Sequence, residues 1–307
     1  MTDTPNLSIS AGDLRAEFLP AAGLLGVSLR YAGEELLRRI DDLESARRKG
    51  STAGIPLLYP WANRLAATHY YAAGREVVLD PASELLHFDD KGLPIHGVPW
   101  GQLSWKVIET KLDSFVARLD WDRMELLAIF PFSHHLEIAA KVTPTALTLQ
   151  TTIFSESGSP VPISFGFHPY FGIPHLPRSQ WRLQAPTMRR LQLDSRGIPT
   201  GTTEDVSPLD TVLGEQNFDD GFALNENPAS FSLSGANYNI TIDFLEGFPY
   251  AQIFAPKGKD FIALEPMTAP TNALSSGEGL RILEPGSQFR ATFRINVRSS
   301  APNSASE

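Results

Sequence analysis

The sequence predicts an all-β protein in which two large antiparallel sheets pack face to face. Three observations support this fold class. Apolar and polar residues alternate repeatedly along the chain, as they do in half-buried strands. Glycine (23 residues) and proline (24 residues) are scattered through the chain, as expected where turns join many short strands. The helical signal is weak, because only one charged segment has a possible helical pattern.

That charged segment, residues 33–50, precedes the predicted strands in the sequence. Its apolar stripe is weak, so it could form a helix that stops at Gly50 or a solvated loop with a short helical piece. The clearest strand is residues 115–121, where alternation places Phe115, Ala117, Leu119 and Trp121 on one face.

Two hairpins and two further strands are expected after that strand. Residues 136–142 and 146–154 form the first hairpin, with a turn at 143–145. Residues 250–255 and 261–264 form the second around the turn 256–260. Residues 239–244 and 288–297 are predicted as single strands, and apolar residues alternate along the whole of the last one.

The composition changes nowhere along the chain in a way that marks a domain boundary. We therefore expect residues 1–307 to form one domain, which is long but within the range of large β-sandwiches, with a frayed tail at about 299–307. The absence of cysteine excludes disulfides, thiolate catalysis and thiolate metal sites, and it suits a reducing, cytoplasmic location.

Charge and hydropathy restrict the expected partners. The N-terminus lacks the basic and apolar regions of a secretory signal, and no apolar run approaches the length of a membrane span. The formal net charge of −9 repels phosphate backbones and anionic lipids. We therefore expect no nucleic acid or membrane partner, and a small neutral ligand is the default.

Two residues stand out as candidates for acid–base chemistry. His168 lies between Phe167 and Pro169, a setting that orients and partly desolvates the ring and tends to lower its pKa while keeping it near neutrality. Glu265 ends an apolar strand, where alternation turns its carboxylate inward, and a buried carboxylate is costly unless it is paired or used. From the residues alone, a core histidine is an equally good interpretation of His168. For Glu265, a buried ion-pair partner or a strand-end residue in water is a slightly better interpretation.

Other polar residues lie in short segments rich in aromatics, proline and glycine. Arg64 follows the run Pro60-Trp61-Ala62-Asn63 and could donate to ligand hydroxyls or brace a carboxylate. His96 precedes Gly97, which permits a close approach or an unusual backbone angle. The pair Asp219-Asp220 is equally compatible with a simple turn.

The adjacent pair His134-His135 is not expected to bind a metal. On a strand, neighbouring side chains point to opposite faces, so these two rings cannot hold one ion together. We expect one ring inside and one outside.

Five segments, taken in order, resemble motifs of the aldose 1-epimerase (mutarotase) family of galactose-mutarotase-like proteins. They span residues 53–270 and read GIPLLYPWANRL, IHG, FGFHPYFGIP, NFDDGFAL and ALEPMTAP. The resemblance implies a large antiparallel β-sandwich, the galactose mutarotase-like supersandwich. It also implies an isomerase of carbohydrate metabolism that needs no metal or cofactor and has a small sugar as its partner.

The resemblance also implies roles for individual residues. His168 matches the family's general acid and Glu265 its general base. Arg64 and His96 match residues near the reacting end of the sugar, and Asp219 matches a hydroxyl-binding aspartate, with Asp220 one position away as the alternative. Asn63 is grouped with these substrate-binding residues, and Trp61 is a hypothetical stacking surface for the sugar. In the implied reaction, Glu265 takes the C1 hydroxyl proton while His168 protonates the ring oxygen, and the opened sugar recloses as the other anomer.

A free aldose is the predicted substrate, with two alternatives of the same fold and a hydrolase or lyase as a third. A hexose 6-phosphate 1-epimerase is disfavoured because the segment after His96-Gly97, Val98 to Gln102, has no basic residue, although Arg75 or Arg178 could bind phosphate from elsewhere. A non-catalytic carbohydrate-binding protein of the same fold is the other alternative. A hydrolase would need a second carboxylate about 5–10 Å from Glu265, for which Asp219 is the candidate.

Overall fold

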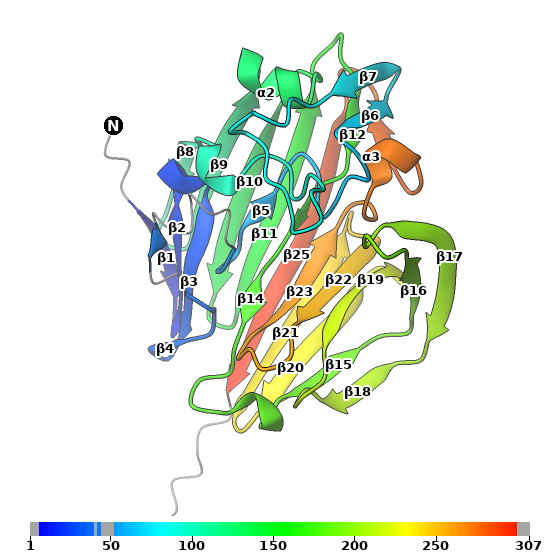
Figure 1. Cartoon of the computed structure of the whole chain (residues 1–307). Coiled ribbons are helices and arrows are strands. Elements are labelled where there is room, and N and C mark those ends of the chain that lie inside the picture. The colour runs from blue at the N-terminus through cyan, green and yellow to red at the C-terminus, as the bar shows by residue number, and fades with distance from the viewer. Residues whose placement is uncertain (1–5, 40–41, 44–51, 300–307) are drawn as a thin grey trace, which may run out of the picture.

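In the computed structural model, residues 6–39, 42–43 and 52–299 are described. Most of them lie in five antiparallel sheets, of which the two largest carry the architecture (Figure 1). The nine-stranded sheet has the order β18-β15-β20-β21-β25-β11-β10-β9-β8. Its strands, in chain order, are β8 (Lys106–Thr110), β9 (Ser114–Trp121), β10 (His134–Thr143), β11 (Ala146–Ser155), β15 (Arg182–Ala185), β18 (Leu209–Val212), β20 (Ala229–Gly235), β21 (Tyr238–Glu246) and β25 (Gln288–Ser299).

The eight-stranded sheet has the order β17-β16-β19-β22-β23-β13-β5, and β14 pairs separately with β23. Its strands are β5 (Leu57–Leu58), β13 (Gly166–Phe167), β14 (Tyr170–Phe171), β16 (Met188–Leu193), β17 (Pro199–Val206), β19 (Phe218–Leu224), β22 (Tyr250–Ala255) and β23 (Ile262–Met267). In Figure 1, β19, β22 and β23 lie in front of the nine-stranded sheet.

Smaller elements complete the described chain. A four-stranded sheet packs beside the β9–β10 region of the large sheet, and two hairpin-like pairs lie near α3. These strands are β1 (Leu7–Ala11), β2 (Leu14–Leu19), β3 (Leu25–Tyr31), β4 (Glu34–Glu35), β6 (His69–Ala72), β7 (Arg75–Val78), β12 (Val161–Ile163) and β24 (Arg281–Leu283). The helices are short: α2 (Met124–Ile129), α3 (Ala273–Ser276), and single 3₁₀ turns at Pro20–Ala22, Trp100–Gln102 and Arg178–Gln180. None of the described helices is long and apolar enough to cross a membrane.

Alternating side chains fill the space between the two large sheets. On β25, Phe289, Ala291, Phe293, Ile295 and Val297 are all buried. Phe293 packs against Phe167 of the opposite sheet, with ring centroids 5.0 Å apart. One continuous hydrophobic core therefore joins the two sheets, as expected for a sandwich.

The predicted strands are confirmed. The face of 115–121 that carries Phe115, Ala117, Leu119 and Trp121 is buried in β9. The first hairpin is β10–β11, with Thr143 opposite Ala146, and the second is β22–β23. Residues 239–244 and 288–297 lie within β21 and β25.

The helical alternative for residues 33–50 is wrong at its start and lies outside the described residues for half of its length. Glu34–Glu35 form β4, and Leu37 makes a β-bridge to Phe171. The expected frayed tail also lies outside the described residues, except for Ser299, which ends β25.

Candidate active site

The eight-stranded sheet turns its second face away from the core, and that face carries the candidate site. On β23, Ile262 and Leu264 enter the core, whereas Ala263 and Glu265 point to the other face. Phe254 of β22 projects to that same side. The period-2 alternation of a strand is what separates core residues from site residues here.

Strand register places His168 directly opposite Glu265, which is 97 positions later in the sequence. Gly166, two residues before His168, pairs with Met267, and Tyr170, two residues after it, pairs with Ala263. Glu265 lies midway between Ala263 and Met267. Because both flanks of His168 are bonded to the strand that carries Glu265, the two side chains must meet.

They do meet, and both are buried. His168 Nε2 lies 3.2 Å from Glu265 Oε1, and the two residues are 5% and 1% exposed. The other two polar atoms of the pair, His168 Nδ1 and Glu265 Oε2, are buried without a hydrogen-bond partner in the described chain. Unpaired polar atoms are costly in a core, and a catalytic role is one of the functions that accounts for them.

Burial shifts both groups toward their neutral forms. Desolvation raises the pKa of the Glu265 carboxyl well above its ordinary value, and the nearby charge of Asp219 adds to that rise. Desolvation lowers the pKa of the His168 imidazole well below its ordinary value, and His96 adds to that fall. Whether the pair is neutral or ionic, it holds one proton in total. Because the pKa of Glu265 is raised and that of His168 is lowered, the pair keeps this one proton over a wider pH range.

Tyr170 and Thr52 brace the imidazole. The rings of Tyr170 and His168 stack with centroids 4.2 Å apart, and the Tyr170 hydroxyl lies 3.1 Å from His168 Nε2. That hydroxyl is in turn hydrogen-bonded to Thr52 Oγ1. The ring plane of His168 is therefore fixed before any ligand binds.

His96 and Asn63 hold each other in strained backbone conformations. The Asn63 N–H donates to His96 Nδ1 at 3.2 Å, and the His96 N–H donates to the Asn63 carbonyl at 2.9 Å. Their φ angles, 56° and 62°, are left-handed, which non-glycine residues adopt only when the surroundings enforce it. Gly97 follows at φ 65°, where a Cβ would meet the Tyr59 carbonyl at 2.3 Å, so the expectation of a special backbone angle is confirmed.

The protonation of His96 follows from that contact. Burial, then Arg64 and His87, lower the pKa of His96 to about 3, so the ring is neutral. Nδ1 accepts a hydrogen bond, so the proton sits on Nε2, which is left as a donor.

Arg64 and Asp219 supply charge to the cavity wall. Arg64 Nε donates to Asp89 at 2.6 Å. Asp219 accepts a hydrogen bond from Gln252 Nε2 at 2.8 Å and pairs in register with Phe254, which places it on the site face. Asp220 faces the other way, 3.5 Å from Arg190. Asp219, rather than its neighbour, is therefore the aspartate at the site.

These side chains surround one cavity of about 220 Å³. Of the predicted site residues, His168, Glu265, Arg64, His96, Asp219 and Asn63 line it. Trp61 does not: it is 1% exposed and lies in the core, as does Phe167. The aromatic residues at the cavity are Tyr170 and Phe254 instead.

Sequence reasoning did not select several lining residues. They are Thr52, His87, Asp89, Ile95, Tyr170, Gln252 and Phe254. Gln252 had a usable signal, since it is a polar residue inside the apolar strand Tyr250–Ala255 and is buried there. Asp89 and Thr52 lie in loops, where nothing in the local pattern indicates what they contact.

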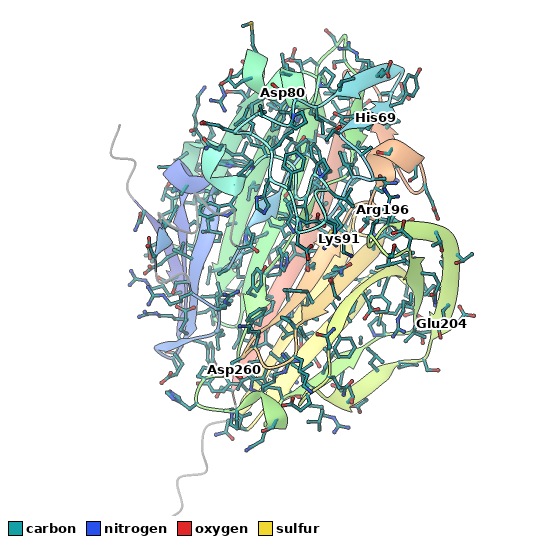
Figure 2. The ribbon with its side chains drawn as sticks, viewed as in Figure 1. His69, Asp80, Lys91, Arg196, Glu204 and Asp260 are labelled. Atoms are coloured by element: carbon teal, nitrogen blue, oxygen red, sulfur yellow. The ribbon has the colours of Figure 1, made fainter. Side chains whose placement is uncertain are left out.

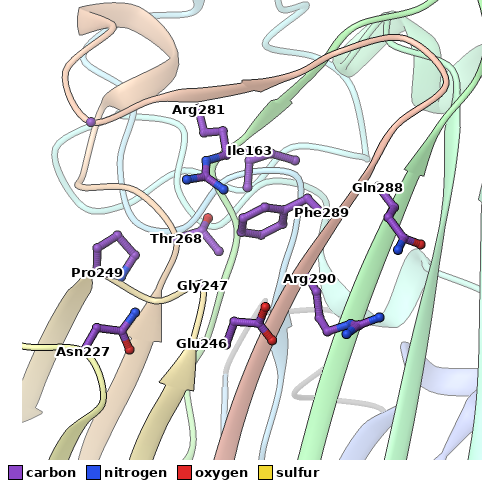
Figure 3. A pocket seen from close by; sticks show the side chains of 11 residues that line it. Ile163, Asn227, Glu246, Gly247, Pro249, Thr268, Arg281, Gln288, Phe289 and Arg290 are labelled. Carbon is purple, nitrogen blue, oxygen red and sulfur yellow. The ribbon is translucent and has the colours of Figure 1, made fainter.

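A larger cavity, about 580 Å³, lies elsewhere between β21, β24 and β25 (Figure 3). Its lining includes Glu246, Arg281 and Arg290 but no histidine, and it contains none of the predicted site residues. Size alone would select this cavity, whereas acid–base chemistry selects the smaller one. Among the described residues, no three His, Asp or Glu side chains are grouped closely enough to hold a metal ion.

The fold and the smaller cavity together define a class: an antiparallel β-sandwich with a buried imidazole–carboxylate pair in a small cavity lined by polar side chains. Comparison with known families narrows the class. Residues 23–296 match the model of the aldose 1-epimerase family, so the chain belongs to that family. The predicted family is confirmed.

The chain is also similar to individual proteins. The chain is 22% identical over 305 residues to the uncharacterized protein YihR of Escherichia coli K12, covering 94% of this chain and 92% of that protein. A galactose mutarotase-like protein of Clostridium acetobutylicum has a TM-score of 0.85 at 18% identity, covering 96% and 95% of the two chains. The Slr1438 protein of Synechocystis sp. PCC 6803 has a TM-score of 0.78 at 24% identity, covering 96% of each chain. At these identities the structural likeness establishes the fold, and the predicted galactose mutarotase-like sandwich is confirmed.

Proposed function

We propose that this protein is an aldose 1-epimerase that interconverts the α and β anomers of a free aldose. The observation that carries the proposal is the 3.2 Å approach of His168 Nε2 to Glu265 Oε1 in a small cavity lined by hydrogen-bonding groups. Family membership supports the same reaction class.

The chemistry needs one proton that can move between two positions. In the reactive state Glu265 is ionised and His168 is protonated. Glu265 takes the proton of the C1 hydroxyl as His168 gives its proton to the ring oxygen, and the C1–O bond to the ring breaks to leave the aldehyde. The pair then holds one proton, taken from the C1 hydroxyl, on Glu265, and both groups are neutral.

Reclosure reverses these transfers after rotation about C1–C2. The hydroxyl formed from the ring oxygen attacks the other face of the carbonyl, and His168 takes its proton. Glu265 returns a proton to O1. Burial of both groups favours the neutral pair.

The remaining polar groups are suited to hold the sugar. Arg64 and the Nε2–H of neutral His96 donate hydrogen bonds, and Asp219 and the amide oxygens of Asn63 and Gln252 accept them. Tyr170 and Phe254 offer apolar surface to the ring carbons. The proposal assigns no sugar contact to Trp61, because it does not line the cavity.

A free sugar is favoured over a sugar phosphate. The two arginines considered for phosphate have other partners: Arg178 donates to backbone carbonyls of Gly214, Pro256, Lys259, Gln216 and Ala255, and Arg75 to that of Pro131. Neither lines the cavity, and the Arg64 charge is offset by Asp89. Lys91 and Arg38 are cations near the cavity but outside its lining that a phosphate could still use.

The test is polarimetry on freshly dissolved α-glucose, α-galactose and other aldoses, and on their 6-phosphates. The protein is expected to accelerate the relaxation of optical rotation for at least one free aldose more than for any 6-phosphate. Sugar binding by calorimetry without acceleration of any sugar would contradict the proposal and indicate a carbohydrate-binding protein. A preference for a 6-phosphate would contradict the choice of a free aldose.

A further inference from the structure

Two loops at the edge of the cavity repeat one sequence pattern. Residues 89–94 read DDKGLP and residues 194–199 read DSRGIP. In the first, Asp89 Oδ1 accepts hydrogen bonds from the N–H groups two and four residues later, both at 2.9 Å. In the second, Asp194 Oδ1 accepts from the equivalent N–H groups at 2.8 and 3.0 Å. Gly92 and Gly197 take left-handed φ angles of 73° and 83°. We call these loops the twin turns.

The twin turns touch each other and Arg64. Lys91 Nζ of the first turn donates to the Ser195 carbonyl of the second at 2.9 Å, and Figure 2 shows Lys91 beside Arg196. Gly197 lies against the guanidinium, since a Cβ at that position would be 3.5 Å from Arg64 Nη1. The second turn is the tip of the β16–β17 hairpin, so this hairpin reaches the cavity through its tip.

The twin turns differ in what the second carboxylate oxygen does. Asp194 Oδ2 accepts from Arg196 Nε of its own turn at 3.3 Å, and its side chain is 35% exposed. Asp89 Oδ2 accepts from Arg64 Nε at 2.6 Å, and its side chain is 6% exposed. Because Asp89 Oδ1 is fixed by the turn, Oδ2 has one position, and it fixes the guanidinium. The two Nη groups of Arg64 donate no hydrogen bond to the described residues.

Charge gives this contact a second consequence. Burial alone would raise the pKa of Asp89, but hydrogen bonds from the Leu93 N–H, Arg64 and the Lys91 N–H lower it, so the carboxylate stays ionised. Among the lining groups, Arg64 is a cation, Asp89 is its ionised partner, and His96 is neutral. Asp89 thus cancels the cation that would otherwise attract an anionic sugar.

We propose that Asp89 is a positioning and specificity-determining residue, which aims Arg64 at the ligand and offsets its charge so that neutral sugars are preferred to anionic ones. This inference rests on the proposed function for its substrate class. Asp194 provides a matched control, because it builds the same turn without contacting Arg64.

The experiment compares D89N with D194N. Asparagine keeps the Oδ1 acceptor that each turn needs, but at position 89 it presents Nδ2–H₂ to the Arg64 Nε–H, donor against donor. We measure KM and kcat for the aldose that the wild-type protein converts best, and Ki for the corresponding uronate as a competitive inhibitor. D89N is expected to raise KM about tenfold with kcat changed less than about twofold, and to lower Ki of the uronate about tenfold. D194N is expected to leave all three constants within about twofold.

The opposite substitution separates charge from folding. R64Q leaves the Asp89 carboxylate uncompensated, so Ki of the uronate is expected to rise, the reverse of D89N. Equal changes in D89N and D194N, or an unchanged uronate Ki in both D89N and R64Q, would overturn the inference. If the wild-type protein converts no aldose, the proposed function fails, and Kd values for the same sugar and uronate then test Asp89 with the same expected directions.

Discussion

Two buried histidines in aromatic surroundings have opposite hydrogen-bonding environments. His134 is 1% exposed, and both of its ring nitrogens have partners: the Tyr59 hydroxyl at Nε2 and the Phe132 carbonyl at Nδ1. His168 is similarly buried, yet its Nδ1 has no partner in the described chain and its Nε2 faces a carboxylate with one unpaired oxygen. Saturation of polar atoms, rather than burial, distinguishes a structural histidine from one that is available for chemistry.

The largest expected effect separates the two histidines by activity. E265Q and H168N remove the base or the acid, so each is expected to lower the rate of mutarotation about 10²–10⁴-fold. Neither is expected to lower the free energy of unfolding, because each replaces a poorly satisfied buried ionisable group with a neutral one. Polarimetry and urea denaturation measure the two quantities. Full activity in both variants would remove the assigned roles.

The converse effect is expected at His134. H134L leaves the buried Tyr59 hydroxyl without its partner, so the free energy of unfolding is expected to fall by about 1–3 kcal/mol. The folded protein should keep its kcat, because His134 does not line the cavity. H135A is the control on the opposite face of β10, where the ring only stacks on Phe154. A loss of kcat in H134L without a loss of stability would break the comparison.

The pH dependence sharpens the comparison at His168. As the pH falls, the pair gains a second proton and loses its base; as the pH rises, it loses its only proton and therefore its acid. Burial lowers the pKa of His168 and raises that of Glu265, so both limits move outward. The plateau of kcat/KM is expected to extend beyond the range from about 4.3 to about 6.5 set by the ordinary values. A bell-shaped pH profile of kcat/KM confined to that range would show that the pair is solvated.

D219N is the control for this pH profile. It should lower the alkaline limit slightly, because Asp219 raises the pKa of Glu265.

The smallest effect concerns the partner of the structural histidine. Y59F removes one hydroxyl from His134 and leaves Nε2 as a buried unpaired atom, at a cost of about 1 kcal/mol in unfolding free energy. Activity is expected to be unchanged. Thermal unfolding and polarimetry on the same sample provide the check, and a larger loss of rate than of stability would link this cluster to the site.

Much of the fold was predictable because period-2 alternation reports which face of a strand is buried. It identified β9, both hairpins and β25. It could not locate the strand Glu34–Glu35 at the beginning of the charged segment 33–50, because these residues form a strand only where β3 provides a partner.

The site was predictable where motifs mark it and not where loops build it. His168, Glu265, Arg64 and His96 could be selected from their surroundings and their resemblance to a family. Trp61 was misplaced, because an aromatic residue beside Arg64 in sequence points into the core, whereas Phe254 reaches the cavity from another strand. Asp89 was missed, because its partner Arg64 lies 25 residues away and the turn that aims it resembles any surface turn.

The register that sets His168 opposite Glu265 also determines where the sequence can tolerate insertions and deletions. The spacing of the pair depends on residues 166–170 and 263–267, which are bonded to one another, and on residues 54–58, which are bonded to the first of these segments. Insertions in the surface loops of the intervening chain would leave the pair in place. A one-residue deletion inside either short segment would turn one side chain to the opposite face and separate the pair. Length variation among natural sequences of this fold should therefore be concentrated between these segments and be absent from them, and a designer could change loop lengths there without rebuilding the acid–base pair.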